Sequence, residues 1–126
     1  MRLLLDTNVF LWWQWQDRRL PADTREAIED QESEIAVSAI PVWEICIKRQ
    51  IGKLDFEGSP IRACEEAGFG LLDVTAVHAA FAGDLPRHHG DPFDRMLIAR
   101  AQVEGFVLVT QDRQLLPYGV PLLGVS

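Results

Sequence analysis

The stretch Phe106-Val107-Leu108-Val109-Thr110-Gln111-Asp112 decides the fold, because it is a short apolar run that ends in an acidic residue. The same pattern opens the chain, where Leu3-Leu4-Leu5 is followed directly by Asp6. Short apolar runs bounded by polar residues are typical of buried strands in a parallel sheet. The carboxyl ends of parallel strands meet at one rim, and ligands bind beyond that rim. We therefore expect Asp6 and Asp112 to lie at a common edge.

Outward from these two runs, strand-length apolar segments alternate with segments that carry helical signals. Further strands are predicted at residues 35–38, 71–74 and 120–123. Helix N-caps are predicted at Ser38, Ser59, Thr75 and Asp91. Asp91 is the clearest, since proline occupies the first helical position after it and a glycine follows the helix end. This alternation predicts an α/β fold, a three-layer α/β/α sandwich with a mostly parallel central sheet.

Length and charge narrow the class of protein. At 126 residues the chain has the length of one domain, residues 1–126. The formal net charge of −7 argues against a broadly basic nucleic-acid binder, although a local basic strip could still contact phosphate. Candidate contacts are Arg18-Arg19, Lys48-Arg49 with Lys53, and Arg87-His88-His89. The apolar run at residues 9–15 is too short to span a bilayer, so we expect a cytoplasmic protein without a membrane partner.

The cysteines, histidines and tryptophans give weaker signals. Cys46 and Cys64 form neither a Cys-x-x-Cys pair nor a zinc spacing, so we expect two partly buried thiols in a reducing compartment. His78 and the pair His88-His89 have no metal partner in the sequence and are left outside the predicted site. Aromatic residues gather at positions 10–15, where they could form core or a surface for a homodimer or partner protein.

Several acidic residues have a structural explanation. Asp6 could cap the helix that follows it, and Asp112 could begin a turn. Asp91 is a good N-cap, and Asp94 stands where an acid favours the positive end of the helix dipole. Glu44 resists this explanation. On a helix it lies on the same stripe as the apolar residues Ile40, Ile47 and Ile51. Asp94 likewise shares a stripe with Leu97, Ile98 and Ala101.

Two carboxylates that face inward from two helices need a partner. At about 4 Å, two such charges repel by about 4 kcal/mol at an effective dielectric near 20, whereas a cap returns only about 1 kcal/mol. Mg²⁺ or Mn²⁺ could hold converging carboxylates, because these hard cations prefer oxygen ligands. The predicted ligands and catalytic residues are Asp6, Glu44, Asp94 and Asp112.

At this point four segments resemble a known family. They are Leu4-Leu5-Asp6-Thr7-Asn8, Trp43-Glu44-Ile45, His89-Gly90-Asp91-Pro92-Phe93-Asp94-Arg95-Met96-Leu97-Ile98-Ala99 and Leu108-Val109-Thr110-Gln111-Asp112. Together they are similar to the PIN domain and, more closely, to the VapC toxins of bacterial type II toxin–antitoxin pairs. The similar segments span nearly the whole chain in the right order, and the run at residues 91–95 is the most specific of them.

The resemblance implies a function. It implies a Mg²⁺- or Mn²⁺-dependent endoribonuclease whose acidic quartet is Asp6, Glu44, Asp94 and Asp112. It also implies RNA as substrate, a homodimer, and a toxin–antitoxin hetero-oligomer with a cognate VapB-like antitoxin. Side chains that could orient the carboxylates or the attacking water are Thr110, Thr7, Asn8 and Ser38. Asp91 could support the site in the same way, although its capping role suffices to explain it.

Two alternatives remain open. One is another Mg²⁺-dependent phosphate-ester hydrolase with an aspartate after its first strand. In such enzymes a second aspartate stands two positions on, where this chain has Asn8. The other is a catalytically inactive PIN-fold interaction module, which should lack one or more of the four acids.

Overall fold

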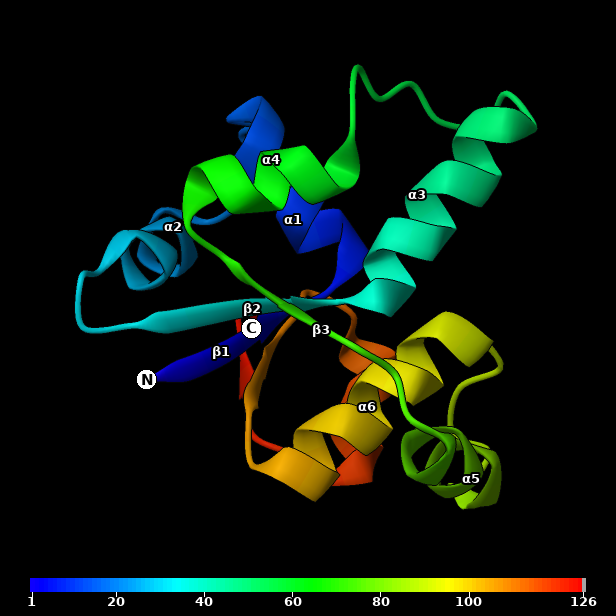
Figure 1. Ribbon diagram of the computed structural model, residues 1–126. Coiled ribbons are helices and arrows are strands. Elements are labelled where there is room, and N and C mark those ends of the chain that lie inside the picture. Colours follow the sequence, from blue (N-terminus) through cyan, green and yellow to red (C-terminus); the bar gives the residue numbers. More distant parts are fainter. Residues whose placement is uncertain (126) are drawn as a thin grey trace.

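A parallel sheet forms the centre of the protein. The structure is a computed structural model that describes residues 1–125. Within that range five strands form one sheet in the order β3-β2-β1-β4-β5, and every pairing is parallel (Figure 1). The strands are β1 (Arg2–Leu5), β2 (Glu34–Ser38), β3 (Gly70–Leu72), β4 (Val107–Val109) and β5 (Leu122–Leu123). The predicted strands are all present, although β3, β4 and β5 are shorter than the apolar runs that predicted them.

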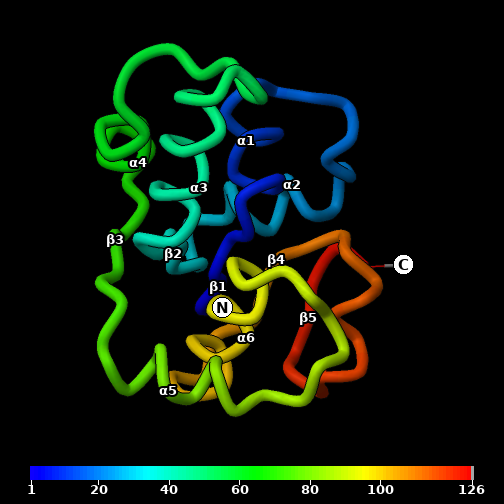
Figure 2. Tube along the Cα trace, turned by 90° about the vertical axis from the view of Figure 1, so that its right-hand side faces the viewer, coloured from blue at the N-terminus to red at the C-terminus, as the bar shows by residue number. Residues whose placement is uncertain are grey.

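Helices cover both faces of this sheet. They are α1 (Thr7–Trp15), α2 (Ala22–Glu29), α3 (Ala39–Gln50), α4 (Pro60–Ala67), α5 (Ala76–Asp84), α6 (Pro92–Glu104) and the 3-10 helix η1 (Arg113–Tyr118). The helices α1 to α4 lie on one face, and α5 and α6 lie on the other (Figures 1 and 2). The predicted three-layer α/β/α sandwich is therefore confirmed.

The predicted caps start the helices where expected. The side chains of Ser38, Ser59, Thr75 and Asp91 each accept a hydrogen bond from a backbone N–H in the first turn of α3, α4, α5 and α6. Gly105 follows α6 in the left-handed conformation, with φ of 74°. Local sequence chemistry thus sets the start of these four helices and, with it, the position of every residue along them.

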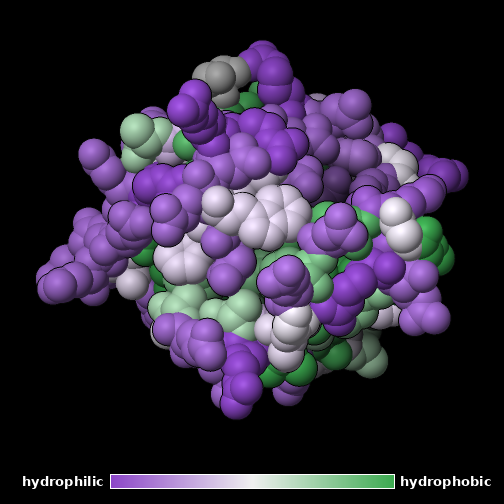
Figure 3. Space-filling model, turned by 90° about the horizontal axis from the view of Figure 1, so that it is seen from above, coloured by the Kyte–Doolittle hydropathy of each residue, from purple (hydrophilic) through white to green (hydrophobic). Residues whose placement is uncertain are grey.

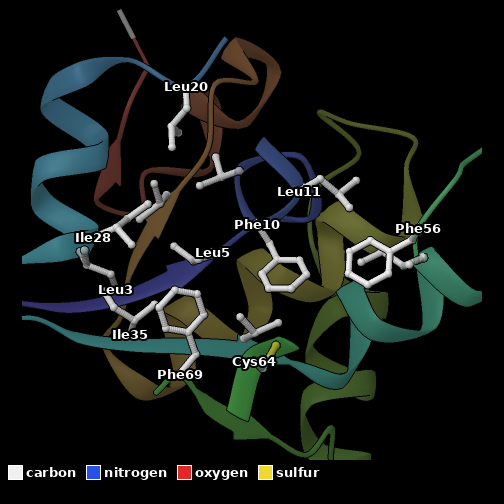
Figure 4. Packing of buried hydrophobic residues seen from close by; sticks show 14 residues of the cluster. Leu3, Leu5, Phe10, Leu11, Leu20, Ile28, Ile35, Phe56, Cys64 and Phe69 are labelled. Atoms are coloured by element: carbon white, nitrogen blue, oxygen red, sulfur yellow. The ribbon is translucent and has the colours of Figure 1, made fainter. Parts of the chain in front are cut away.

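The core lies in two layers, one on each side of the sheet. Leu3 and Leu5 point into the layer under α1 to α4, whereas Leu4 points into the layer against α6 and η1. Figure 4 shows the first layer, where Phe10 of α1 meets residues from the sheet and α4. Burial on both faces explains why residues 3–5 of β1 are all apolar and do not alternate with polar ones.

Two sequence-based expectations about burial need correction or refinement. Cys64 is buried, but Cys46 is exposed, so the prediction of two partly buried thiols is wrong for Cys46. The aromatic residues after β1 divide between core and surface, because Phe10 is buried while Trp15 is exposed.

Seen from above, hydrophilic side chains cover much of the molecule, with a band of paler and more hydrophobic ones among them (Figure 3). Among residues 1–125 we find no helix with the length and hydropathy that a membrane span requires.

Candidate metal centre

The carboxyl ends of β1 and β4 bring two acids to one rim. These strands are neighbours, with Leu5 opposite Val109, and the Asp6 N–H donates to the Val109 carbonyl over 3.0 Å. Asp112 follows β4 after two further residues. Helices α3 and α6, which contact one another, approach the same rim with Glu44 and Asp94. As a result, all four predicted acids line one cleft of about 110 Å³, together with Thr7, Asn8, Lys48 and Asp91.

Asp6 is a cap and a cleft residue at the same time. It is buried, and one carboxylate oxygen accepts from the Val9 N–H at 2.8 Å, which caps α1. Burial raises its pKa to about 6, against the lowering effect of hydrogen bonds from Thr110 and Val9, and the charges of Glu44 and Asp112 raise it further. No ion pair involving Asp6 is found in residues 1–125. A buried carboxylate without a cationic partner is the setting in which a bound metal ion would lower the free energy most.

Glu44 is buried and held from two sides. Its Oε1 accepts from the Thr7 hydroxyl at 2.7 Å, and its Oε2 pairs with the Lys48 ammonium at 2.5 Å. The stripe used to predict its burial is shorter than expected. Ile40 is buried, but α3 ends at Gln50 and Ile51 is 58% exposed, so Ile51 does not extend the apolar face. The inward position of Glu44 therefore follows from the first half of α3 and from Thr7.

The pKa of Asp94 is raised further than that of Asp6. Its pKa is raised to about 7, first by burial and then by the negative charges of Asp91 and Asp6. Capping does not explain its place, because the side chain that caps α6 is Asp91, which accepts from the Phe93 N–H at 2.8 Å and the Asp94 N–H at 3.4 Å. The apolar stripe next to Asp94 is buried as predicted, at Leu97, Ile98 and Ala101.

Asp112 lies at the more open side of the cleft and has a partner that the sequence did not indicate. One oxygen caps η1 by accepting from the Gln114 N–H at 2.9 Å, and Oδ2 lies 2.8 Å from Nε2 of His89. His89 was left outside the predicted site, and the structure corrects this. It belongs to the loop between α5 and α6, which has no hydrophobic period, and only the path of that loop across the rim brings it to Asp112.

The other histidines lie elsewhere. His78 is buried between α5 and α6, where its Nε2 lies 2.9 Å from a Glu104 oxygen. The His88 ring packs edge-on against Tyr118, with 5.0 Å between the ring centroids.

The candidate ligand atoms of the cleft are not all equally close to one another. In residues 1–125 the tight group is His89, Asp94 and Asp112, whose candidate ligand atoms lie within 4.8 Å of one another. Asp6 and Glu44 line the same cleft but stand outside that group, and Lys48 together with Thr7 holds Glu44 to one side. Carboxylates dominate the donor set, which fits Mg²⁺ or Mn²⁺ and disfavours softer metals.

The predicted supporting residues separate into two groups. Thr7 and Thr110 contact acids of the cleft directly, through Glu44 and Asp6. Asn8 lines the cleft, whereas the Ser38 hydroxyl caps α3 by accepting from the Ile40 N–H.

The basic candidates separate in the same way. Lys48 lines the cleft, and His89 borders it through its contact with Asp112. Arg19 pairs with Asp17, and Arg49 donates to the carbonyls of Phe56 and Gly58.

Comparison with known proteins places this chain in a family. The PIN domain family matches residues 3–119. Ribonuclease VapC22 of Mycobacterium tuberculosis is 32% identical over 116 residues, which cover 90% of this chain and 88% of that protein.

Solved structures share the fold at lower identity. The VapBC2 structure from Rickettsia felis, bound to a promoter DNA fragment, matches with a TM-score of 0.69 and 16% identity over 98% of each chain. DNA-bound VapBC from Salmonella typhimurium matches with a TM-score of 0.68 and 21% identity, over 98% of this chain and 97% of that one. With the family match over nearly the whole chain and the VapC relative above 30% identity, this chain belongs to the PIN domain family and, within it, to the VapC type.

Proposed function

We propose that the protein is a Mg²⁺- or Mn²⁺-dependent endoribonuclease that acts as the toxin of a toxin–antitoxin pair. The observation that carries this proposal is the meeting of Asp6, Glu44, Asp94 and Asp112 in one small cleft. Burial and mutual repulsion raise the pKa of two of these acids, which is an unfavourable arrangement unless a cation binds there. VapC22, the relative at 32% identity, is a ribonuclease by name.

In this proposal the four acids hold the cation and are the catalytic residues. When bound, a divalent cation lowers the pKa of water and neutralises charge on the phosphate that is attacked. The chain itself orients the acids: Thr7 donates to Glu44, and Thr110 bonds Asp6. Lys48 stands at the cleft with its side chain 44% exposed, where it can attract a phosphate of the RNA backbone.

The proposal extends to partners and location. The solved structures with this fold include VapBC complexes and a toxin–antitoxin complex from Klebsiella pneumoniae, which supports a cognate VapB-like antitoxin for this chain. We also propose a homodimer, a toxin–antitoxin hetero-oligomer and a cytoplasmic location. An antitoxin segment that lies in the acidic cleft would exclude the RNA and the cation together.

RNA cleavage by the purified protein tests the enzymatic half of the proposal. Wild-type protein should cut labelled RNA internally with Mn²⁺ and should not cut it with EDTA. Asp94→Asn should abolish cleavage, whereas Asp55→Asn makes the same change of charge in an exposed loop away from the cleft and should cleave like the wild type. Equal cleavage by the wild type and the Asp94 variant would refute the assignment.

Growth arrest tests the toxin half. Expression of the wild-type chain without its antitoxin should stop growth, and Asp6→Asn should relieve the arrest. Asparagine retains the cap on α1, so the fold should survive this change. Continued arrest by a folded Asp6→Asn protein would show that toxicity does not depend on the acids.

A further inference from the structure

The histidine at the cleft has a defined role in the structure. We propose that His89 is a positioning residue, which holds Asp112 ready to bind the cation by donating a hydrogen bond from Nε2, and that it is not itself a metal ligand. This inference rests on the proposed function and names one more residue that the site needs.

The orientation of the His89 ring follows from its second nitrogen. Nδ1 lies 3.0 Å from the backbone nitrogen of Asp91, which carries a hydrogen and can only donate. Nδ1 must therefore present its lone pair. A neutral imidazole has one N–H, so the proton is on Nε2, the nitrogen that faces the acids.

The backbone around His89 keeps the ring in this position. The His89 N–H donates to the Tyr118 hydroxyl at 3.1 Å, and that hydroxyl donates to the Pro86 carbonyl at 2.9 Å. Only 13% of the His89 side chain is exposed. Contacts on both sides of the loop therefore fix where the Nε2–H points, and tie the loop to η1.

The Nε2–H reaches the most exposed of the four acids. Asp112 Oδ2 is 2.8 Å from Nε2, and Asp94 Oδ2 is 3.3 Å away from it. The Asp112 side chain is 33% exposed, more than that of Asp94 or Glu44. With Oδ1 bonded to the Gln114 N–H and Oδ2 bonded to His89, the carboxylate cannot rotate freely. Each oxygen has a second lone pair, so Asp112 can accept these bonds and still bind a cation.

The same contacts argue against His89 as a ligand. To bind a metal through Nε2, the ring would have to carry its proton on Nδ1. That proton would then face the Asp91 N–H, and two donors would meet at 3.0 Å. The short distances within the group of His89, Asp94 and Asp112 therefore describe a donor between two acceptors.

Two substitutions separate the two nitrogens of the ring. His89→Gln places an amide NH₂ near the position of Nε2 and keeps a donor for Asp112. His89→Asn is shorter, so its amide oxygen can replace Nδ1 as the acceptor for Asp91, but it does not reach Asp112. Both variants keep a polar, uncharged residue in the loop, which makes each the control of the other.

Mn²⁺ binding by calorimetry, on the purified full chain, is the first measurement. His89→Asn should weaken Mn²⁺ affinity by about 10- to 100-fold, the usual effect of losing a partner of a metal ligand. His89→Gln should bind Mn²⁺ within about threefold of the wild type. If both variants bind like the wild type, or if Gln loses as much affinity as Asn, the role of His89 is overturned while the proposed function stands. A wild-type chain that binds no Mn²⁺ overturns both.

Pulsed electron paramagnetic resonance of the Mn²⁺-loaded wild type is the second measurement, since it detects nitrogen bound directly to the ion. We expect no directly bound nitrogen in the wild type and the same spectrum for His89→Gln. A strong nitrogen coupling in the wild type that is lost in both variants would make His89 a ligand and overturn the proposal.

Discussion

Asp94→Asn should stabilise the metal-free protein and destabilise the protein in Mn²⁺. In the absence of a cation, the ionised Asp94 is half-buried among other acids, and its pKa is raised from 3.8 to about 7. Asparagine keeps the shape of the side chain and removes the charge. The cap on α6 stays intact, because Asp91 supplies it.

The magnitude follows from the pKa shift. The rise of the Asp94 pKa from 3.8 to about 7 corresponds to about 4 kcal/mol between the two protonation states. Asparagine gives up the favourable interaction of an acid with the helix dipole, worth about 0.3 to 1 kcal/mol. Solvent reaches 21% of the side chain and reduces the gain further. We therefore expect Asp94→Asn to raise the free energy of unfolding by on the order of 2 kcal/mol at pH 8.

Saturating Mn²⁺ should reverse the order of the two proteins. A ligand that binds only the folded state adds about 2.7 kcal/mol at a concentration of about 100 times its Kd. The wild type should gain this stability, and Asp94→Asn should gain little of it.

Urea denaturation, followed by tryptophan fluorescence, measures both effects. Wild type, Asp94→Asn and the exposed control Asp55→Asn are compared at pH 8, once in EDTA and once in Mn²⁺. Repetition at pH 5 in EDTA should shrink the advantage of Asp94→Asn, because the folded wild-type carboxyl is then mostly protonated; the advantage should vanish only below the ordinary pKa of 3.8, where the unfolded carboxyl is protonated too. A variant that is less stable than the wild type in EDTA at pH 8 would show that Asp94 stabilises the helix, and would refute the reasoning.

Three further predictions test the surroundings of the acids. The metal-free wild type should lose stability as the pH rises from about 4 to about 7. The reason is that the folded-state pKa values of Asp6 and Asp94 are about 6 and about 7, above the usual 3.8, so the folded state binds more protons than the unfolded state over this range. A urea midpoint that rises with pH over this range would contradict the prediction. Thr7→Val removes the hydroxyl that donates to Glu44 at 2.7 Å and should weaken Mn²⁺ binding about 10-fold in calorimetry, with folding retained; unchanged affinity would show that the hydroxyl is dispensable. Gly124→Ala should cost about 1 to 3 kcal/mol in urea denaturation, because φ is +97° there and a Cβ would lie 3.0 Å from the Thr110 carbonyl oxygen; wild-type stability would mean that the β5 end shifts freely.

Much of the fold could be predicted because local chemistry and tertiary structure agree. Asp91-Pro92 starts α6 and Gly105 follows its end, so the place of Asp94 one turn in was available from the sequence. Asp6 and Asp112 follow apolar runs of strand length, and parallel neighbours must end at one rim. These inferences need no knowledge of distant contacts.

Positions that depend on the path of the chain could not be predicted in this way. His89 lies in a loop without any hydrophobic period, and its partners Tyr118 and Asp112 lie more than twenty residues away in sequence. The periodicity used for Glu44 fails at Ile51, because α3 ends before the predicted stripe does. Cys46 is exposed although its helical neighbour Ile45 is fully buried, since one residue along a helix turns to another face.

Anomalous diffraction from crystals soaked in Mn²⁺ tests most directly whether the four acids form a metal centre. We predict a manganese peak in the cleft within ligand distance of Asp6 and Asp94, with Asp112 held beside it by His89, and no such peak in Asp94→Asn crystals soaked in the same way. A cleft that stays free of manganese in wild-type crystals, at a Mn²⁺ concentration that supports RNA cleavage, would contradict the assignment.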